Sequence, residues 1–426
     1  MIIMPDGQKH FDVAIIGGGP AGMISAGRAG ELGASVILIE KNKNLGRKLL
    51  IAGKGRCNIT NKENNPREFI SKFGKNGKFL FSAFFRFGVQ ETINFFEKLN
   101  LKTKIERGGR VFPVSDKSQD VLETLIGYLK KSNVKIKLNS EVKEIIKNPS
   151  TVLGASNKIE KIILVNNEEI TANKFIISTG GKSYSKTGST GDGYKWVKKL
   201  GHTITNLSPS LVPIIVKEKI VEELEGLSLK NVEISVYKEN KKIDSRFGEA
   251  IFTADGISGP IIIDMSKKIG QELPKNIKIK IDFKPALDFL KLDRRVQEDF
   301  RKDSKKMFKN SLNNLLPQKL IPVIVKLSKI NPDKKSGFIT KEERKKLLHL
   351  LKEFTLEVKS LAIHEKAVIT SGGVKLSEVD QKTMKSKLID NLYFAGEILD
   401  IDGPTGGYNL QICWTTGYIA GESVVF

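Results

Sequence analysis

The chain has 426 residues, of which 39% are hydrophobic and 28% are charged, and this composition excludes a wholly disordered protein. Only two cysteines are present, Cys57 and Cys413, which excludes a disulfide framework and a four-thiolate zinc site and indicates a reducing compartment. Lysine and arginine number 71 against 48 acidic residues, a net charge of +23 that would attract anionic ligands, nucleic acid or membrane surfaces.

Most of this charge is interpreted as lysine spread over solvated faces, because no run of five basic residues occurs and no nucleic-acid-binding module is recognisable. No nucleic-acid partner is therefore expected. No apolar stretch approaches the roughly 20 residues of a membrane-spanning helix, and Met1–His10 is too short and polar for a signal peptide. The sequence predicts a cytoplasmic protein without membrane contact and leaves its oligomeric state open.

The clearest local pattern lies near the N-terminus. An apolar run over 11–16 is typical of a parallel strand buried on both faces, and it leads directly into the glycine-rich segment 17–22. A helix is expected from there to about residue 32, followed by a second strand over 35–39 that ends at Glu40. These segments predict one β-α-β unit.

The glycine-rich turn has the spacing Gly17-x-Gly19-x-x-Gly22. Gly17 permits the tight turn, Gly19 lets a pyrophosphate approach the backbone, and Gly22 allows close packing of helix on strand. The phosphates are expected at the helix N-terminus, and Glu40 is expected to accept hydrogen bonds from the adenosine ribose. This pattern predicts dinucleotide binding, although an ordinary strand–helix turn carries the same glycines.

Two parts of the remaining chain are distinguished by composition. A β-rich inserted domain is expected from 203 to 284, and charged helical periodicity follows over 286–350, where Pro317 and Pro322 predict several short helices. The other elements are, in order, a ligand-wrapping loop over 45–61, helices over 79–100 and 120–130, strands over 134–146, 160–170 and 175–181, strands again after 353, and a final helix.

The C-terminal region favours FAD over NAD as the dinucleotide. A strand over 392–397 is followed by the glycine-rich segment 404–411 and a helix, as in FAD enzymes whose chain returns to the cofactor. That helix N-terminus would hold negative charge at N1 and the C2 oxygen of a reduced flavin. A glycine-rich loop that merely caps a core helix is the alternative.

The sequence resembles the bacterial NAD(P)/FAD-dependent flavoproteins described as BaiN-like or aminoacetone-oxidase-like. The resemblance is carried, in the family's order, by residues 46–61, 109–115, 188–194, 383–387 and 395–411. It implies an α/β protein with a discontinuous Rossmann-like FAD-binding domain, an inserted β-barrel-like domain and a small helical subdomain. The predicted divisions are 1–200 and 365–426 for the FAD-binding domain, 201–285 for the β-rich substrate domain with 352–364 as its return strand, and 286–351 for the helical subdomain.

The motifs and the resemblance together define the candidate cofactor-binding residues. By resemblance, the loop 47–58 runs along the pyrophosphate and flavin, and 179–181 is a second glycine-containing strand end near FAD. Val142 is either a backbone contact for adenine or a core residue, and Tyr408 either bonds a substrate carbonyl or packs. The candidates are Gly17, Gly19, Pro20, Ala21, Gly22, Glu40, Lys41, Arg47, Lys48, Leu49, Gly55, Arg56, Cys57, Asn58, Val142, Thr179, Gly180, Gly181, Gly396, Glu397, Gly407, Tyr408, Asn409 and Leu410.

One departure from the family leaves the catalytic residues unassigned. Family members commonly have Phe-Thr-His-x-Gly-x-Ser-Gly-Pro where this chain has Ala254 in the histidine position. Asp255 either substitutes for that histidine or is an exposed turn aspartate. Cys57 and Cys413 are either a flavin-linked dithiol or two buried thiols. No metal is assigned, because the four histidines, His10, His202, His349 and His364, have no metal-ligand spacing.

The sequence therefore predicts an FAD-dependent oxidoreductase in which hydride passes through flavin N5 between a small organic substrate and a nicotinamide or another acceptor. No second strand–GxGxxG–helix unit is found, so NAD(P)H is expected only as a transient co-substrate. Two alternatives stay open: an FAD-dependent RNA-modifying enzyme, motivated by the charge, and a non-catalytic flavin-binding protein, motivated by Ala254.

Overall fold

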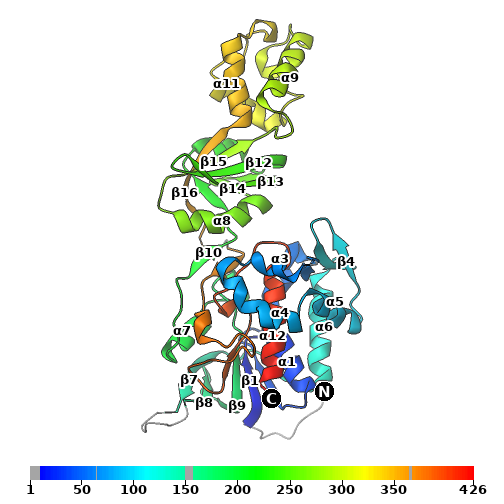
Figure 1. Ribbon diagram of the computed structural model, residues 1–426, viewed down its shortest axis with the longest axis vertical. Coiled ribbons are helices and arrows are strands. Elements are labelled where there is room, and N and C mark those ends of the chain that lie inside the picture. Colours follow the sequence, from blue (N-terminus) through cyan, green and yellow to red (C-terminus); the bar gives the residue numbers. More distant parts are fainter. Residues whose placement is uncertain (1–9, 64, 149–156, 364–366) are drawn as a thin grey trace. The chain divides into compact units, whose positions relative to one another are not determined.

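The computed structural model describes residues 10–63, 65–148, 157–363 and 367–426, so His364 lies outside the described residues. The chain forms two compact units, one of residues 1–208 with 368–426 and the other of residues 209–367 (Figure 1). The chain leaves the first unit through β10 (Ser208–Ser210) and returns to it at β17 (Ile369–Ser371), and these two strands pair as a two-stranded sheet. Among the described helices, none has the length and hydropathy required to cross a lipid bilayer.

The first unit is built on a seven-stranded sheet in the order β6-β2-β1-β9-β8-β7, with β18 also paired to β9. Five strands run parallel, whereas β7–β8 and β8–β9 are antiparallel pairs. The apolar runs predicted as buried strands form the centre of this sheet. Such strands are apolar throughout because both faces of the sheet are covered there. The strands are β1 (His10–Ile16), β2 (Val36–Ile39), β6 (Lys135–Lys137), β7 (Val142–Lys147), β8 (Ile159–Leu164), β9 (Glu169–Ile177) and β18 (Leu392–Phe394).

Helices of the first unit pack on this sheet and on one another, and α12 lies beside α1 (Figure 1). A small sheet of β3 (Thr60–Asn61), β5 (Arg110–Pro113) and β4 (Thr103–Glu106) lies apart from the main one. The helices are α1 (Pro20–Glu31), α2 (Arg47–Ile51), α3 (Pro66–Ser71), α4 (Phe81–Arg86), α5 (Val89–Lys98), α6 (Ser118–Lys131), α7 (Asp192–Lys199) and α12 (Tyr408–Ser423).

The helix expected over 79–100 is interrupted, which corrects the sequence interpretation. The chain leaves α4 at Phe87, and α5 begins after Gly88, whose N–H donates to Glu91 Oε2 at 3.0 Å. That carboxylate caps the new helix N-terminus, so local hydrogen bonding stabilises a second start within an otherwise continuous apolar pattern.

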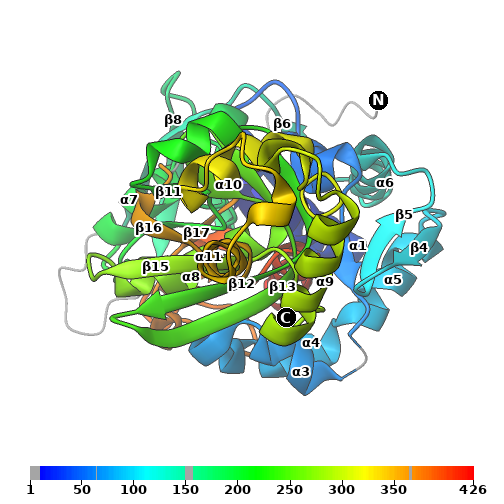
Figure 2. The same ribbon diagram turned by 90° about the horizontal axis from the view of Figure 1, so that it is seen from above.

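The second unit contains a closed antiparallel barrel in the order β11-β14-β13-β12-β15-β16, whose long strands β12 and β13 lie side by side in Figure 2. Strict alternation produces its interior: Ile277, Ile279 and Ile281 are fully buried, whereas Lys278 and Lys280 are not. The elements are β11 (Ile214–Val216), β12 (Ser228–Lys238), β13 (Lys241–Thr253), β14 (Gly256–Ser258), α8 (Pro260–Glu272), β15 (Ile277–Asp282) and β16 (Phe354–Leu361).

Helices α9 (Phe289–Lys302), α10 (Ile321–Ser328) and α11 (Lys341–Lys352) complete the second unit. Pro322 lies in the first turn of α10, where a missing N–H costs no helical hydrogen bond. The helices and the barrel share one hydrophobic core, since α11 packs on β15 and β16 and continues almost directly into β16. The helical segment and the barrel thus form one compact unit, although the sequence pattern suggests a division.

Candidate functional site

The carboxyl ends of four parallel strands meet at one edge of the large sheet. Backbone hydrogen bonds join them there: Gly17 N–H to Ile39 O at 2.9 Å, Ser178 N–H to Ile16 O at 2.9 Å, and Ala395 N–H to Ile177 O at 3.1 Å. This edge is where open α/β sheets bind ligands. It brings together four groups of predicted residues: Gly17 to Gly22 after β1, Glu40 after β2, Thr179 to Gly181 after β9, and Gly396 and Glu397 after β18.

The three glycines of the first turn have different surroundings. Gly17 has φ +107°, and a Cβ there would lie 2.7 Å from Ser178 O. A Cβ on Gly22 would lie 1.9 Å from Gly17 O, so α1 packs directly on the end of β1. No protein atom lies within 4 Å of a Cβ on Gly19, which precedes α1 without a side-chain cap. The backbone at Gly19 is therefore the part of this turn that an anion can approach.

Glu40 is buried, and its carboxylate organises the turn. Oε2 accepts the Gly18 N–H at 2.7 Å, and Oε1 accepts the backbone N–H and side-chain amide of Asn42 at 2.8 and 2.5 Å. These bonds use three of the roughly four lone-pair positions that a carboxylate offers. Glu40 thus positions the loop around Gly18, while its bond to a ribose hydroxyl stays a prediction.

Lys48 on α2 and Glu397 after β18 form an ion pair between distant parts of the sequence. Lys48 Nζ lies 2.7 Å from Glu397 Oε2 and 2.7 Å from Ser183 Oγ. Glu397 Oε1 accepts the Thr370 N–H at 2.9 Å. Both side chains are largely buried, so this network holds α2 and the end of β18 together.

The other predicted cations have separate partners. Lys41 pairs with Asp192 at 2.8 Å; burial opposes ionisation of that carboxyl, but hydrogen bonds from Lys41 and Thr190 outweigh it and lower its pKa. Arg56 is paired with acidic side chains and lies 4.1 Å above the Phe112 ring. Arg47 is exposed, donates to Asn42 Oδ1 at 2.6 Å, and forms no ion pair among the described residues. Arg47 is thus the cation best able to meet a phosphate.

The C-terminal loop closes against the segment that follows Cys57. Gly407 has φ +101° before α12, and a Cβ there would lie 2.4 Å from the Thr60 carbonyl. Asn409 bonds both backbone groups of Gly403, with its Oδ1 2.8 Å from the Gly403 N–H. Tyr408 is buried with its ring 4.7 Å from the Phe69 ring, which favours packing over contact with a substrate. Leu410 packs partly buried against the core.

Helices α1 and α12 run in the same direction and are staggered. A Cβ on Gly417 would lie 2.6 Å from Ala21 O, and a Cβ on Gly421 would lie 2.4 Å from Ser25 O, which sets the register. Tyr408 therefore begins α12 about 12 Å beyond the start of α1, at 1.5 Å per residue. Neither helix N-terminus has a side-chain cap. An extended dinucleotide is able to meet both N-termini.

Two buried polar atoms support a ligand at this edge. Asn58 Oδ1 and Thr179 Oγ1 are buried and have no hydrogen-bond partner within the described residues. Buried polar side chains in proteins are almost always hydrogen-bonded. Both were predicted to contact the cofactor, and Gly55 and Gly180, which have φ +85° and +72°, belong to the same two loops. The residues present therefore fit FAD.

The cysteines and Val142 have the surroundings of core residues. Burial raises the pKa of Cys57 well above its usual range and raises that of Cys413 to about 12, so both remain thiols at neutral pH. This favours two buried thiols over a redox dithiol. Val142 is buried on β7 and pairs with Leu164, and its backbone contact with adenine stays a prediction.

Ala254 and Asp255 form the turn between β13 and β14, and both are exposed. Asp255 Oδ1 accepts the Thr253 hydroxyl at 3.1 Å, the usual arrangement of a turn aspartate. The structure therefore gives no reason to assign proton transfer to Asp255. No group of three or more metal-ligating side chains occurs in the part of the chain that the structure describes.

Sequence reasoning missed three residues that support the site, namely Asn42, Ser183 and Thr370. Asn42 bonds Glu40 and Arg47, and its position two residues after the strand-end acid is a usable signal. Ser183 and Thr370 bond Lys48 and Glu397 across long sequence separations. Neither residue lies in a recognisable motif, so only the fold reveals them.

In a comparison with known proteins, residues 11–423 match the family described as "HI0933-like protein Rossmann domain". The 3-dehydro-bile acid delta(4,6)-reductase of Clostridium scindens (strain ATCC 35704 / DSM 5676 / VPI 13733 / 19) is 31% identical over 415 residues, which cover 96% of this chain and 98% of the relative. The ribosomal RNA dihydrouridine synthase of Escherichia coli (strain K12) is 28% identical over 421 residues, or 98% of this chain and 99% of the relative.

Among solved structures, the 3-ketosteroid delta1-dehydrogenase from Sterolibacterium denitrificans matches with a TM-score of 0.54 at 12% identity, covering 98% of this chain and 100% of that chain. A likeness at this identity concerns the fold alone. With the sheet and barrel described above, it confirms the predicted class, a Rossmann-like α/β domain with an inserted β-barrel.

Proposed function

This chain belongs to the family of HI0933-like proteins with a Rossmann domain, in agreement with its resemblance to BaiN-like flavoproteins, and is an FAD-dependent oxidoreductase; we propose that it reduces a carbon–carbon double bond conjugated with a carbonyl group. The proposed substrate is a small organic molecule, and the proposed electron donor is a nicotinamide nucleotide. The cofactor part of the proposal is carried by four strand ends that meet at one sheet edge beside the uncapped N-terminus of α1, with the uncapped N-terminus of α12 farther along; the bond type is supported by the relatives.

Particular residues would hold the cofactor. The N-terminus of α1 with the backbone of Gly19 binds the diphosphate, and Arg47 adds a cation there. The N-terminus of α12 stabilises negative charge at the flavin ring. Lys48 and Glu397 hold α2 against the end of β18, where Asn58 and Thr179 offer their unpartnered oxygens. FAD, when bound, supplies hydride chemistry at N5, which no side chain provides.

The bond type follows from what the names of the relatives share. A 3-dehydro-bile acid with 4,6 double bonds is a conjugated ketone, and dihydrouridine is uridine whose 5,6 double bond, conjugated with the C4 carbonyl, is saturated. Both names therefore describe reduction of a double bond next to a carbonyl group. The similarity of this chain to both relatives supports the same bond type here.

The test begins with the visible spectrum of the purified protein, which is expected to show bound flavin. Anaerobic addition of NADH or NADPH is then expected to bleach the flavin absorbance, and a conjugated enone is expected to restore it. A saturated ketone of the same skeleton is the control and should leave the bleached spectrum unchanged. A colourless protein that takes up no FAD, or a flavin that neither nucleotide reduces, contradicts the proposal.

Reduction of uracil in ribosomal RNA is a second candidate function. It is favoured by the relatedness to a dihydrouridine synthase over 98% of this chain and by the net charge of +23. The same anaerobic assay separates the two: ribosomal RNA lacking the modification, rather than a free enone, would reoxidise the flavin. A non-catalytic flavin-binding role is not proposed, since the chain belongs to a family of enzymes.

A further inference from the structure

Positive charge in the second unit is concentrated in its helical part. Residues 286–351 contain 17 lysines and arginines against 8 acidic residues, a net charge of +9. The rest of that unit, 209–285 and 352–367, contains 16 basic and 15 acidic residues, a net charge of +1. The two parts share one hydrophobic core, so core packing does not account for this asymmetry. The charge belongs to the exposed surface of the helices and their loops.

Two paired loops gather part of this charge on one surface. The loop after α9 bonds the loop before α11: Phe308 N–H to Lys334 O at 2.8 Å, Ser336 N–H to Lys306 O at 2.9 Å, and Gly337 N–H to Ser304 O at 3.2 Å. We call the surface formed there the paired-loop surface. Its six defining residues, all exposed, are Arg301, Lys302, Lys305, Met307, Lys335 and Phe338.

The four cations of the paired-loop surface have no acidic partner within 4.0 Å among the described residues, and these are Arg301, Lys302, Lys305 and Lys335. Their neighbours differ: Lys306 pairs with Asp303 at 2.9 Å, Lys309 with Asp333 at 2.7 Å, and Lys334 with Glu343 at 2.7 Å. These pairs occupy the nearby carboxylates. The four remaining cations are therefore available to an external anion.

The same pair of loops exposes two large apolar side chains. Phe338 is 72% exposed, and Met307, which pairs with Lys335 in an isolated β-bridge, is 43% exposed. The backbone of Phe338 is held in a short turn, where its N–H donates to Lys335 O at 2.9 Å. Exposed aromatic rings and unpartnered cations in one pair of loops are the residue types on which nucleic-acid bases stack while their phosphates are neutralised.

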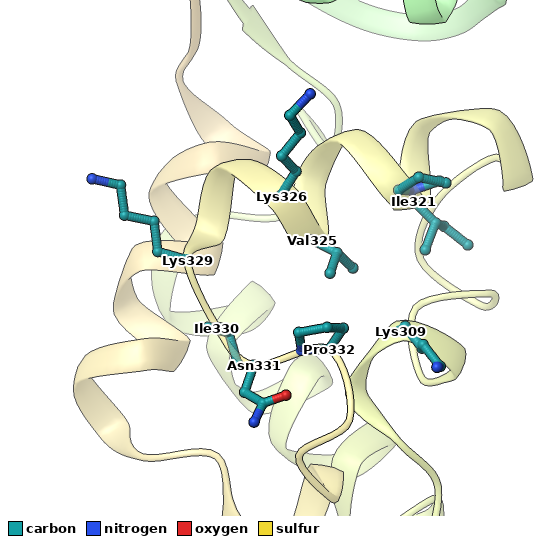
Figure 3. A pocket seen from close by; sticks show the side chains of 9 residues that line it. Lys309, Ile321, Val325, Lys326, Lys329, Ile330, Asn331 and Pro332 are labelled. Atoms are coloured by element: carbon teal, nitrogen blue, oxygen red, sulfur yellow. The ribbon is translucent and has the colours of Figure 1, made fainter.

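A hollow of about 690 Å³ adjoins the paired loops, since Lys309 N–H bonds Pro332 O at 3.1 Å and both residues line it. In Figure 3, Ile321, Val325 and Pro332 point into the hollow, whereas the Lys326 and Lys329 side chains extend away from it. Lys309 and Lys326 are paired with Asp333 and Glu223, so the hollow offers apolar walls that suit the flat face of a base and contributes little charge of its own.

We propose that the paired-loop surface binds single-stranded RNA, with phosphates at the four unpartnered cations and a base stacked on Phe338. RNA is favoured over an anionic membrane, because the paired-loop surface exposes only two large apolar side chains, Met307 and Phe338, against four cations, which is less than the apolar face that inserts between lipids. The inference rests on the second candidate function in one respect, because that function would make the bound RNA the substrate of the enzyme. RNA binding itself does not depend on the flavin.

The test uses the full-length, FAD-loaded protein and a fluorescently labelled single-stranded RNA of mixed sequence, with anisotropy measured over a range of salt concentrations. If all four cations contact phosphate, the logarithm of the affinity should fall against the logarithm of salt concentration with a slope of about −3. The variant Arg301→Gln/Lys302→Gln/Lys305→Gln/Lys335→Gln is expected to lose at least about tenfold in affinity and most of that slope.

The matched control is Lys219→Gln/Lys230→Gln/Lys241→Gln/Lys359→Gln, which removes the same charge from exposed positions of the barrel part. It should retain nearly all of the affinity. Phe338→Ala should weaken binding by about tenfold with the salt slope unchanged, because a ring contributes stacking and no charge. Thermal unfolding of each variant should match the wild type, since these side chains are exposed.

Three results would overturn the inference: no RNA binding by the wild type, equal loss in the barrel control, or binding of anionic lipid vesicles that the four-cation variant loses while RNA binding persists. Flavin reduction by NADH or NADPH is measured on the same samples. If the flavin is not reduced but RNA binds through these residues, the proposed function fails and this inference stands. If the flavin is reduced but RNA does not bind, this inference fails and the proposed function stands.

Discussion

Gly19 and Gly22 lie three residues apart in one turn, yet an added methyl group would meet different surroundings at the two positions. At Gly22 it would lie 1.9 Å from the carbonyl oxygen of Gly17, whereas at Gly19 it would meet no protein atom within 4 Å. Gly22 is therefore explained by packing within the chain. At Gly19 no such packing exists, and the backbone is open to the approach of an external group.

We expect Gly22→Ala to lower the free energy of unfolding by about 1–3 kcal/mol, because the backbone must shift to relieve the overlap. Gly19→Ala should leave the unfolding midpoint of the FAD-free protein unchanged and weaken FAD binding about tenfold or more, since the methyl group occupies the approach to α1. Thermal unfolding and flavin fluorescence titration measure the two effects. Unchanged FAD affinity in Gly19→Ala would show that the diphosphate lies elsewhere.

His202 is buried between Glu378 and Ser386, 3.1 and 2.8 Å from its two ring nitrogens, and it contacts the Phe394 ring edge-on. Burial lowers its pKa below the ordinary value of 6.5, despite the neighbouring Glu378. Neutral His202 therefore contributes stability that is present above the unfolded value and is lost as pH falls through the folded value.

The expected outcome is that the unfolding temperature of the wild type falls between about pH 7.5 and 5, and that His202→Gln, which cannot titrate, shows a smaller fall. Differential scanning calorimetry at both pH values checks this. His10 is exposed on β1, so His10→Gln is the control and should keep the wild-type pH dependence. Equal pH dependence in His202→Gln would refute the assignment.

Helices α1 and α12 pack closely because glycines of α12 face the backbone of α1. A Cβ on Gly421 would lie 2.4 Å from Ser25 O, and a Cβ on Gly417 would lie 2.4 Å from Ile24 Cγ2. This contact places the N-terminus of α12 relative to that of α1. The helix pair thus couples packing of the first unit to the spacing of its two uncapped N-termini.

Gly421→Ala is expected to destabilise the protein by about 1–3 kcal/mol, because the helices must separate. Gly127→Ala is the matched control: Gly127 is exposed in the middle of α6 with no atom near its Cβ position, so alanine should raise stability by about 0.5–1 kcal/mol. Urea unfolding of both variants measures the difference. If both substitutions stabilise the protein, close packing of α1 and α12 is not required.

The candidate cofactor-binding residues and the inserted part lie in different units of the chain. Every candidate cofactor-binding residue lies in residues 1–208 or 368–426, and that unit has its own hydrophobic core. Residues 209–367 form a second core. Since β10 pairs with β17, the two chain segments that lead into the inserted unit lie side by side. A short linker is therefore able to replace that unit.

A variant in which residues 212–366 are replaced by a short glycine-serine linker is expected to fold and to bind one FAD. The first unit buries its own core, and the replaced segment contributes none of the candidate residues. Flavin content after gel filtration and thermal unfolding, compared with the full-length protein, measure this. A folded but colourless variant would place part of the cofactor site in the inserted unit.

Features that depend on local interactions were predictable from the sequence, whereas features that depend on specific contacts between side chains were not. The β-α-β unit, the β-rich insert and the final helix were predictable, because their hydrophobic periodicity and glycines report local backbone geometry, whereas closure of the insert into a barrel was expected from the family resemblance. Residues 79–100 are helical as expected but form two helices, because a capping contact between Gly88 and Glu91 starts a second helix within the apolar periodicity. The concentration of charge in 286–351 was present in the sequence, but the overall count of +23 concealed it.

The sequence, together with its family resemblance, was sufficient to predict the fold class, the glycine-rich strand ends and FAD as the ligand, because strand and turn signals are local and the family motifs can be recognised without the fold. Tertiary structure decided which cations remain available. Lys48 is held by Glu397, Arg56 is occupied by acidic neighbours, and Arg47 has no acidic partner among the described residues. Nothing local to these residues encodes that outcome, because an ion pair forms only where the fold brings two distant side chains together.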